Sequence, residues 1–420
     1  MAHTTHETRS RAVPHIMSPQ PALGRGLVLL MALAAALSCA GNYFAQPLLD
    51  IIEGNLHIGV TAAGLIVTAA QAGYALGLIL LVPLGDVMDR RRLAVGLFAL
   101  TAVFLLATAA APTGPLLIAG TLLTALTSVG AQVVVPFAAA LAAPAERGRI
   151  VGVVMSGVLL GGLFGRLAAG ALSEFGGWRT VYWVNALLMA VMAVLLYQRL
   201  PRLPRPGDAA AAMSYVGLLR STLALLRQEP LLRRRAAIGA FSMASYSVQL
   251  TALTFLLTRP PFGWNAAAIG LFGLVGVIGV VGMNIGARLS DRGRVQAVSG
   301  TAAALLTLAW LPLLAGESSL LWLTVGVILL NIAQQAGLNS SQNVIYALRP
   351  EARNRVNSAF MTLFFMGGAA GAALASVVWS RAGWSGICLL GAVLAAGSLV
   401  LWVLERVRAA SAARPGAVSR

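Results

Sequence analysis

The sequence predicts an all-α polytopic membrane protein with twelve transmembrane helices, arranged as two six-helix pseudo-repeats. Three observations predict this fold class: the composition, a series of long apolar segments, and an internal duplication. Of the 420 residues, 58% are hydrophobic and 10% are charged, whereas soluble domains carry about 25% charged residues. A chain with so few charges cannot cover a water-exposed surface, so we expect it to lie in a lipid bilayer.

Twelve apolar segments are long enough to cross about 30 Å of hydrocarbon, which takes about 20 helical residues. They cover residues 25–48, 60–83, 93–111, 115–141, 150–172, 178–199, 236–258, 266–287, 295–315, 319–346, 356–378 and 383–404. We therefore expect a disordered N-terminus, an N-terminal bundle, a linker loop, a C-terminal bundle and a tail. Their respective boundaries are 1–24, 25–199, 200–235, 236–406 and 407–420.

The distribution of arginine predicts how the chain is oriented. All thirty basic residues are arginine, and all but Arg166, Arg179, Arg259 and Arg381 fall in the termini or in alternate loops. Basic loops stay on the cytoplasmic side of a membrane. We therefore expect a bacterial inner-membrane protein with both termini in the cytoplasm. The net charge of +17 is then a topology signal and does not indicate nucleic-acid binding.

Two recurrences indicate that the chain is duplicated. ProAlaGluArgGlyArg at 144–149 aligns with ProGluAlaArgAsnArg at 350–355, and the match continues through the pairs Gly161 and Gly367, Gly165 and Gly371, and Trp178 and Trp384. GDVMDRRR at 85–92 likewise corresponds to LSDRGR at 289–294. Internal repeats in a helical membrane protein favour a transporter whose substrate site lies between the two halves.

Polar side chains recur four residues apart in four of the segments, so each set lies on one helical face. Such a face is costly against lipid, and the four segments correspond pairwise by the repeat. We therefore expect a shared central cavity. Its candidate substrate-binding residues are Asn42, Gln46, Ser128, Gln132, Tyr246, Gln249, Asn331, Gln335 and Asn339. The alternative is that these groups only join helices by hydrogen bonds.

Two motifs resemble the major facilitator superfamily, and the resemblance covers the chain from the first segment to the twelfth. PLGDVMDRRR at 83–92 is similar to the signature that follows the family's second helix, although Val82 and Asp89 depart from it. Gly152, Gly161, Gly165 and Gly170 fall on the spacing of the exporter-type signature in the fifth helix. This second motif is similar to drug:proton antiporters and to sugar or metabolite exporters. The resemblance implies alternating access, export and a proton as coupling ion.

Several residues are candidates for controlling the conformational cycle. Asp86 at a cytoplasmic helix end can pair with loop arginines and stabilise an outward-facing state, or it can be a solvated topology signal. The candidate gating residues are Asp86, Arg90, Arg91, Arg149, Asp291, Arg292, Gly161, Gly165 and Arg166.

Arg166 stands where the fifth-helix signature has proline, inside an apolar segment. Three interpretations are open for it. It can extend to the outer headgroups, it can pair with a group on another helix such as Asp50, or it can bind an anionic or hydrogen-bonding substrate. No carboxylate lies in the middle of a segment. Asp50, at an outer end, is therefore the one candidate for proton coupling.

These observations predict a monomeric secondary transporter that exports a small neutral or amphipathic molecule, such as a drug-like compound, sugar or metabolite. An uptake permease or an uncoupled facilitator is the alternative within the class, because no acid is buried. An enzyme would need a nucleophile–base pair, a metal cluster or a carboxylate dyad, and the segments offer none. We expect neither a metal nor a cofactor. A receptor or scaffold is disfavoured by the duplicated halves and the paired polar faces.

Overall fold

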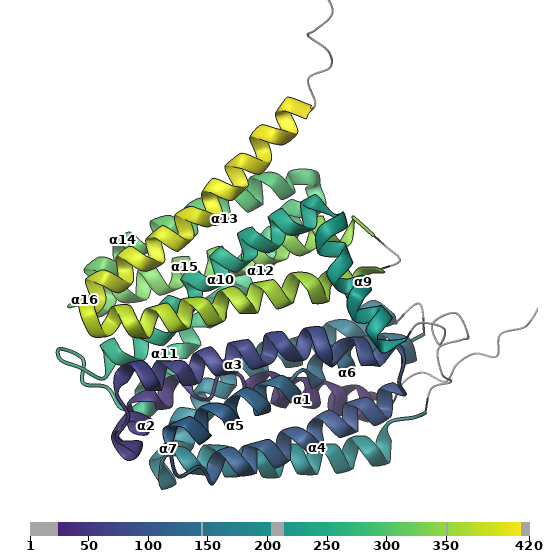
Figure 1. Cartoon of the computed structure of the whole chain (residues 1–420), viewed down its shortest axis with the longest axis horizontal. Helices are drawn as coiled ribbons and strands as arrows, with labels where there is room; N and C mark the ends of the chain where they lie inside the picture. The colour runs from purple at the N-terminus through teal and green to yellow at the C-terminus, as the bar shows by residue number, and fades with distance from the viewer. Residues whose placement is uncertain (1–23, 144–145, 203–213, 350–351, 413–420) are drawn as a thin grey trace, which may run out of the picture.

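The computed structural model describes residues 24–143, 146–202, 214–349 and 352–412. The expected disordered N-terminus up to residue 23, the repeat residues Pro144 and Pro350, and the end of the expected tail lie outside the described residues. Within these ranges the chain forms helices and no strand, as the sequence predicts. Figure 1 shows the helices arranged as two bundles, with the N-terminal half (purple to blue) below the C-terminal half (green to yellow).

The helices before the linker have these bounds: α1 (Arg25–Ala40), η1 (Gln46–Leu48), α2 (Leu49–Leu56), α3 (Val60–Leu80), η2 (Val82–Asp86), α4 (Arg90–Ala109), α5 (Gly114–Thr127), α6 (Gly130–Leu141) and α7 (Arg147–Arg199). The linker helix and the second half follow: α9 (Tyr215–Gln228), α10 (Pro230–Leu257), α11 (Ala266–Phe272), η3 (Gly273–Val277), α12 (Ile278–Leu289), η4 (Ser290–Arg294), α13 (Val295–Leu308), α14 (Trp310–Ala315), α15 (Leu320–Tyr346) and α16 (Arg353–Ala412).

Eight helical stretches of the described chain are long and apolar enough to cross a membrane, and three of them hold two crossings each. α7 turns at Gly177, α16 at Gly383, and the stretch from α11 to α14 at Gly293, all at positive φ. Glycine adopts this backbone conformation without strain. With the shorter apolar helix α1, the described residues contain the twelve predicted segments. We call residues 147–175 and 178–199 the first and second arms of α7.

The segment 200–235, expected as a loop, contains the helix α9 and the start of α10. Hydropathy alone missed α9 because only one of its faces is apolar, with Leu218 and Leu225 buried. The Tyr215 hydroxyl donates to the Leu80 carbonyl (2.6 Å), and Arg355 donates to the Ser221 hydroxyl (3.1 Å). α9 therefore contacts both halves at the end that carries the arginine loops, which we call the arginine-rich end (Figure 1).

In each half, two helix backbones come into direct contact at a glycine. A Cβ placed on Gly161 of α7 would lie 2.1 Å from the Ala36 carbonyl oxygen of α1. A Cβ on Gly367 of α16 would lie 2.2 Å from the Ala240 oxygen of α10. These glycines are partners in the sequence repeat, so the same close approach occurs twice. Small residues at such contacts are what allow helices to pack without a hydrophobic driving force in lipid.

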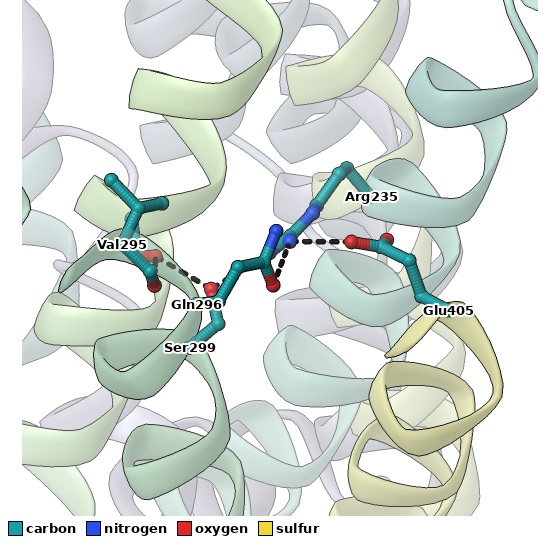
Figure 2. Close-up of polar contacts among 6 residues, drawn as sticks. Arg235, Val295, Gln296, Ser299 and Glu405 are labelled. Atoms are coloured by element: carbon teal, nitrogen blue, oxygen red, sulfur yellow. Dashed lines mark hydrogen bonds and ion pairs between the residues drawn. The ribbon is translucent and has the colours of Figure 1, made fainter. Parts of the chain in front are cut away.

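A buried ion pair joins the start of α10 to the end of α16 (Figure 2). The Arg235 side chain is fully buried and donates to Glu405 Oε1 (2.5 Å), Gln296 Oε1 (2.9 Å) and the Ser299 hydroxyl (2.7 Å). The sequence predicts Arg235 at the end of the linker loop 200–235, but it lies inside a helix, because α10 begins five residues earlier. Removing one partner of a buried pair leaves an uncompensated charge, which is strongly destabilising.

Replacing Gly161 with valine is expected to lower thermal stability, since the new side chain would meet the α1 backbone. Overpacking of this kind costs about 1–3 kcal/mol. Thermal unfolding of the purified protein in detergent measures the effect. Gly152→Val is the matched control on the same helix, because a Cβ there meets nothing within 4 Å. Equal stability of the two variants would contradict the packing described here.

Glu405→Ala is expected to destabilise the fold by about 3–5 kcal/mol, the usual cost of breaking a buried pair. The control is Glu146→Ala, which removes an exposed partner of Arg149 at 2.8 Å and is expected to cost at most about 1 kcal/mol. Chemical unfolding in detergent, read from tryptophan fluorescence, compares them. A Glu405→Ala effect no larger than that of Glu146→Ala would show that Arg235 does not depend on this carboxylate.

Candidate functional site

Two helix breaks face the first arm of α7. α1 ends at Ala40 and the chain continues through a turn and the short helix η1. In the second half, α11 and α12 are separated by the 3₁₀ helix η3. Irregular backbone at membrane depth is tolerated only where protein or a cavity surrounds it. Broken helices of this kind commonly form the substrate sites of transporters.

A third break, between α5 and α6, has a structural explanation. The Ser38 hydroxyl of α1 donates to the Ser128 carbonyl (2.6 Å) and accepts from the Ala131 amide (3.1 Å), so it bridges the break. The Ser128 hydroxyl donates to the Thr124 carbonyl within its own helix (2.8 Å). Ser128, expected in the central cavity, therefore lies buried inside the N-terminal half. Its contacts are those of interhelical packing.

Arg166 lies between the two facing breaks. Its Nε donates to Gln46 Oε1 (2.8 Å), and its guanidinium carbon is 4.7 Å from the centre of the Tyr43 ring. A Cβ placed on Gly273 of η3 would lie 3.3 Å from Arg166 Cδ. The side chain is half-buried. Of the three interpretations of Arg166, these contacts fit a group held inside the protein and do not fit one that extends to the headgroups.

Asp50, the expected partner of Arg166, is exposed on α2 at the end remote from the arginine loops, which we call the opposite end. Its charge is close enough to Glu53 of the same helix to affect the pKa of the Glu53 carboxyl. Burial, and then the charge of Asp50, raise the pKa of the Glu53 carboxyl, although Arg259 acts to lower it. Arg259 follows α10, so this group of charges includes both halves of the chain.

Polar residues of α10 and α15 meet beside the η3 break. The Tyr246 hydroxyl donates to Asn331 Oδ1 (3.0 Å), and Asn331 Nδ2 donates to the Val327 carbonyl (2.8 Å). A Cβ placed on Gly276 would lie 3.4 Å from Asn331 Oδ1 and 4.0 Å from Arg166 Nη1. This arrangement brings together predicted residues from both halves. They are Gln46 and Arg166 of the first half and Tyr246 and Asn331 of the second.

A cavity lies between the halves near the arginine-rich end. Its lining includes Gln132 of α6, Arg90 of α4 and Arg355 of α16. Gln132 Nε2 donates to the Tyr74 hydroxyl (3.4 Å), and the Tyr74 ring packs edge-on against Phe365 at 4.6 Å. The cavity therefore combines amide and guanidinium groups with an apolar wall that includes Leu78, Val82 and Val133, and the Tyr74–Phe365 contact lies behind Gln132.

The halves are packed together at the opposite end. A Cβ on Gly170 would lie 2.4 Å from the Ala266 oxygen, and one on Gly270 would lie 2.7 Å from the Arg166 oxygen. The Thr254 hydroxyl of α10 donates to the Gln46 carbonyl (2.8 Å). These contacts leave no room for a side chain between the first arm of α7 and α11. The structure is therefore closed at this end and has its cavity at the other.

The remaining candidates are dispersed. Gln335 packs on Gly279, and Asn339 accepts from Asn343 (3.2 Å). Gln249 is fully buried, and both of its side-chain polar atoms are unpaired among the described residues.

The gating candidates are also dispersed. Arg91 donates to the Tyr197 carbonyl within its own half, and Arg149 pairs with Glu146. Asp291 and Arg292 are exposed, and the side chain of Asp86 lies outside the described part of the chain.

Comparison with known proteins decides the family, since the family model of the Major Facilitator Superfamily matches residues 31–345. The chain belongs to the major facilitator superfamily. The family resemblance and the fold are thereby confirmed, as is the expectation of a transporter and not an enzyme.

Two relatives and one solved structure illustrate the similarity. The uncharacterized transporter YgaY of Escherichia coli K12 is 43% identical over 91% of this chain and 96% of its own. The chloramphenicol resistance protein of Streptomyces lividans is 28% identical over 67% of this chain and 70% of its own. A crystal structure of a bacterial homolog to the human lysosomal transporter Spinster, inward-facing and occupied, superposes with a TM-score of 0.70. It is 15% identical and covers 92% of this chain and 95% of the other.

Sequence reasoning missed two members of these groups. Tyr43 lies between Asn42 and Gln46 and so falls outside the spacing of four residues that predicted the polar faces. The segment that holds it is not helical. Glu53 was not among the candidates for proton coupling. Its place three residues after Asp50 in the short helix α2 was the available signal.

Thr254→Val is expected to weaken closure at the opposite end, because it removes the hydrogen bond to Gln46. One hydrogen bond contributes about 0.5–1.5 kcal/mol, or roughly a 2- to 10-fold shift in the equilibrium. The readout is labelling of Gln132→Cys by a membrane-impermeant maleimide from the arginine-rich end, with Cys39 and Cys388 replaced by alanine. The labelling rate is expected to fall.

Thr258→Val is the control on the same helix, since that hydroxyl bonds only the Phe255 carbonyl of its own helix (3.4 Å). It is expected to leave labelling unchanged. Unchanged labelling in Thr254→Val as well would mean that this hydrogen bond does not hold the end closed.

Proposed function

We propose that this chain exports a small amphipathic organic molecule by alternating access. The observation that carries the proposal is the arrangement of the two ends. A cavity lined by Gln132, Arg90 and Arg355 lies at the arginine-rich end, and glycine contacts close the opposite end. Its apolar lining residues, such as Leu78 and Val133, suit an apolar body, and the amide and guanidinium groups suit a polar end.

The proposed direction of transport, export, rests on the orientation in the membrane together with the resemblance to exporters. We propose that the arginine-rich end faces the cytoplasm of a bacterial inner membrane, because basic loops are retained there. Both termini are then cytoplasmic, and the cavity is open to molecules inside the cell. The glycine spacing of the first arm of α7 and the similarity to a chloramphenicol resistance protein support export.

We propose a proton as the coupling ion, with the pair Asp50 and Glu53 as its binding groups. Support comes from the raised pKa of Glu53, whose first cause is burial. A carboxyl with a raised pKa takes up a proton at a higher external pH than an ordinary glutamate does. Its neighbour Arg259 lies on the other half, so protonation would change an attraction between the halves.

An uptake permease or an uncoupled facilitator is the second candidate. It is favoured by the lining of the cavity, in which the described residues include no carboxylate. Carboxylates that bind protons in the transport path are the usual means of coupling.

The proposed function is tested by the accumulation of dyes, antibiotics and sugars in cells lacking their own efflux pumps. Cells expressing the chain are expected to accumulate less of at least one compound, and a protonophore is expected to abolish the difference. A difference that persists with the protonophore selects the uncoupled facilitator. Greater accumulation of a compound by expressing cells selects an uptake permease.

In the same assay, Glu53→Gln is expected to flatten the dependence of export on external pH. The wild type loses export as the pH rises through the raised pKa of Glu53, because the carboxyl then stays ionised. Asp50→Asn is the companion variant, since it removes the neighbouring charge that helps raise this pKa. A pH profile that is identical in wild type and Glu53→Gln rules out Glu53 as the coupling group.

A further inference from the structure

Two arginines lie inside the helix bundles, Arg235 and Arg166, and their surroundings differ. Arg235 has a carboxylate 2.5 Å away and two further hydrogen-bond acceptors (Figure 2). Among the described residues, no carboxylate oxygen lies within 4.0 Å of a guanidinium nitrogen of Arg166. The ion pairs in this part of the chain are formed by other arginines. Arg166 lies five residues past the middle of the first arm of α7, about 7.5 Å from the centre of the membrane. A charge at such a depth is expensive and marks a functional site by default.

We propose that Arg166 binds a carboxylate group of the transported molecule, an inference that rests on the proposed function. The two terminal nitrogens of its guanidinium have no hydrogen-bond partner among the described residues, because Gln46 occupies only Nε. A guanidinium presents these nitrogens as a fork that matches the two oxygens of a carboxylate. The substrate then supplies the counterion that the chain lacks.

The groups around the fork are arranged to receive an anion. Tyr43 covers one side of the guanidinium and fixes its plane. Gln46 Oε1 accepts from Arg166, which assigns the other side-chain atom, Nε2, as a donor, and this buried Nε2 has no partner. It can donate to the same carboxylate. The amide and the guanidinium thus form one donor set.

The η3 break places two glycines against the Arg166 side chain. A Cβ on Gly273 would lie 3.3 Å from Arg166 Cδ, and one on Gly276 would lie 4.0 Å from Arg166 Nη1 and 3.4 Å from Asn331 Oδ1. A larger side chain at either position would therefore crowd the guanidinium or its stem. Asn331 already accepts from Tyr246, so it does not compete strongly as a partner for Arg166. The side chain of Arg166 is not fully buried, so part of its surface is not covered by other residues.

A purely structural role, in which Arg166 only joins α7 to η1, makes a different prediction for one substitution. Gln46→Glu places a carboxylate where Gln46 Oε1 lies, 2.8 Å from Arg166 Nε. A structural contact would be strengthened. An anion site would be filled by the chain itself, and the external carboxylate would be excluded.

The test uses the purified full-length chain and a panel of amphipathic aryl carboxylates, each paired with its own carboxamide. Thermal unfolding is followed at fixed ionic strength and pH. For the wild type, at least one carboxylate is expected to raise the melting temperature more than its amide. This preference is expected to fall at least tenfold in apparent affinity in Arg166→Gln and in Gln46→Glu, the second of which remains at least as stable as the wild type.

Arg179→Gln is the matched control, since Arg179 also stacks on an aromatic ring, that of Trp178 at 4.3 Å, but bonds the Ala111 carbonyl outside the cavity. It is expected to keep the preference. The proposal is overturned if no carboxylate is preferred over its amide, or if the preference survives in Gln46→Glu. Loss of the preference in Arg179→Gln would overturn it too, because net charge would then explain the result.

The outcomes separate this inference from the proposed function. If cells export the amides as well as the carboxylates and the preference is absent, export stands and the anion site falls. If the preference depends on Arg166 but no compound leaves the cell in the accumulation assay, the anion site stands and export falls.

Discussion

The fold depends on two helix pairs whose backbones are in direct contact. In lipid no hydrophobic effect drives helices together, so their association relies on close packing. Gly161 against Ala36 in the first half and Gly367 against Ala240 in the second provide it. The first of these contacts also orients the first arm of α7 so that Arg166, five residues further on, points toward the broken end of α1. The packing of the half and the position of the charged group therefore have one cause.

The two inward arginines show how charge is handled in an apolar chain. Arg235 donates to three side chains from two other helices, α13 and α16, and these contacts are all within the second half. Arg166 contacts residues at the boundary between the halves, where the environment changes if the halves move. A group satisfied in every state stabilises the fold, whereas a group satisfied in one state favours that state over the other. The same residue type serves different purposes because of where its neighbours belong.

Most of the fold could be predicted from the sequence, because segment length and hydropathy are direct consequences of the bilayer. The observed turns at Gly177 and Gly383 each precede one member of the aligned pair Trp178 and Trp384, so they occupy equivalent places in the repeat. The candidate site was harder to predict from the sequence. Gln46 and Arg166 were both singled out, but their contact depends on η1 replacing regular helix, and no periodicity signals that change. Ser128 matched the polar pattern and yet bridges a break inside one half. The linker helix α9 was missed since hydropathy averages over its two faces.

That linker helix connects the halves by more than covalent chain. Tyr215 and Ser221 bond it to α3 and α16 respectively, and its 14 residues span about 21 Å as a helix. A flexible linker would allow any separation up to its extended length. A helix bonded to both halves instead links them at a fixed distance at the arginine-rich end. A relative movement of the halves must therefore break one of these two bonds or carry α9 with it.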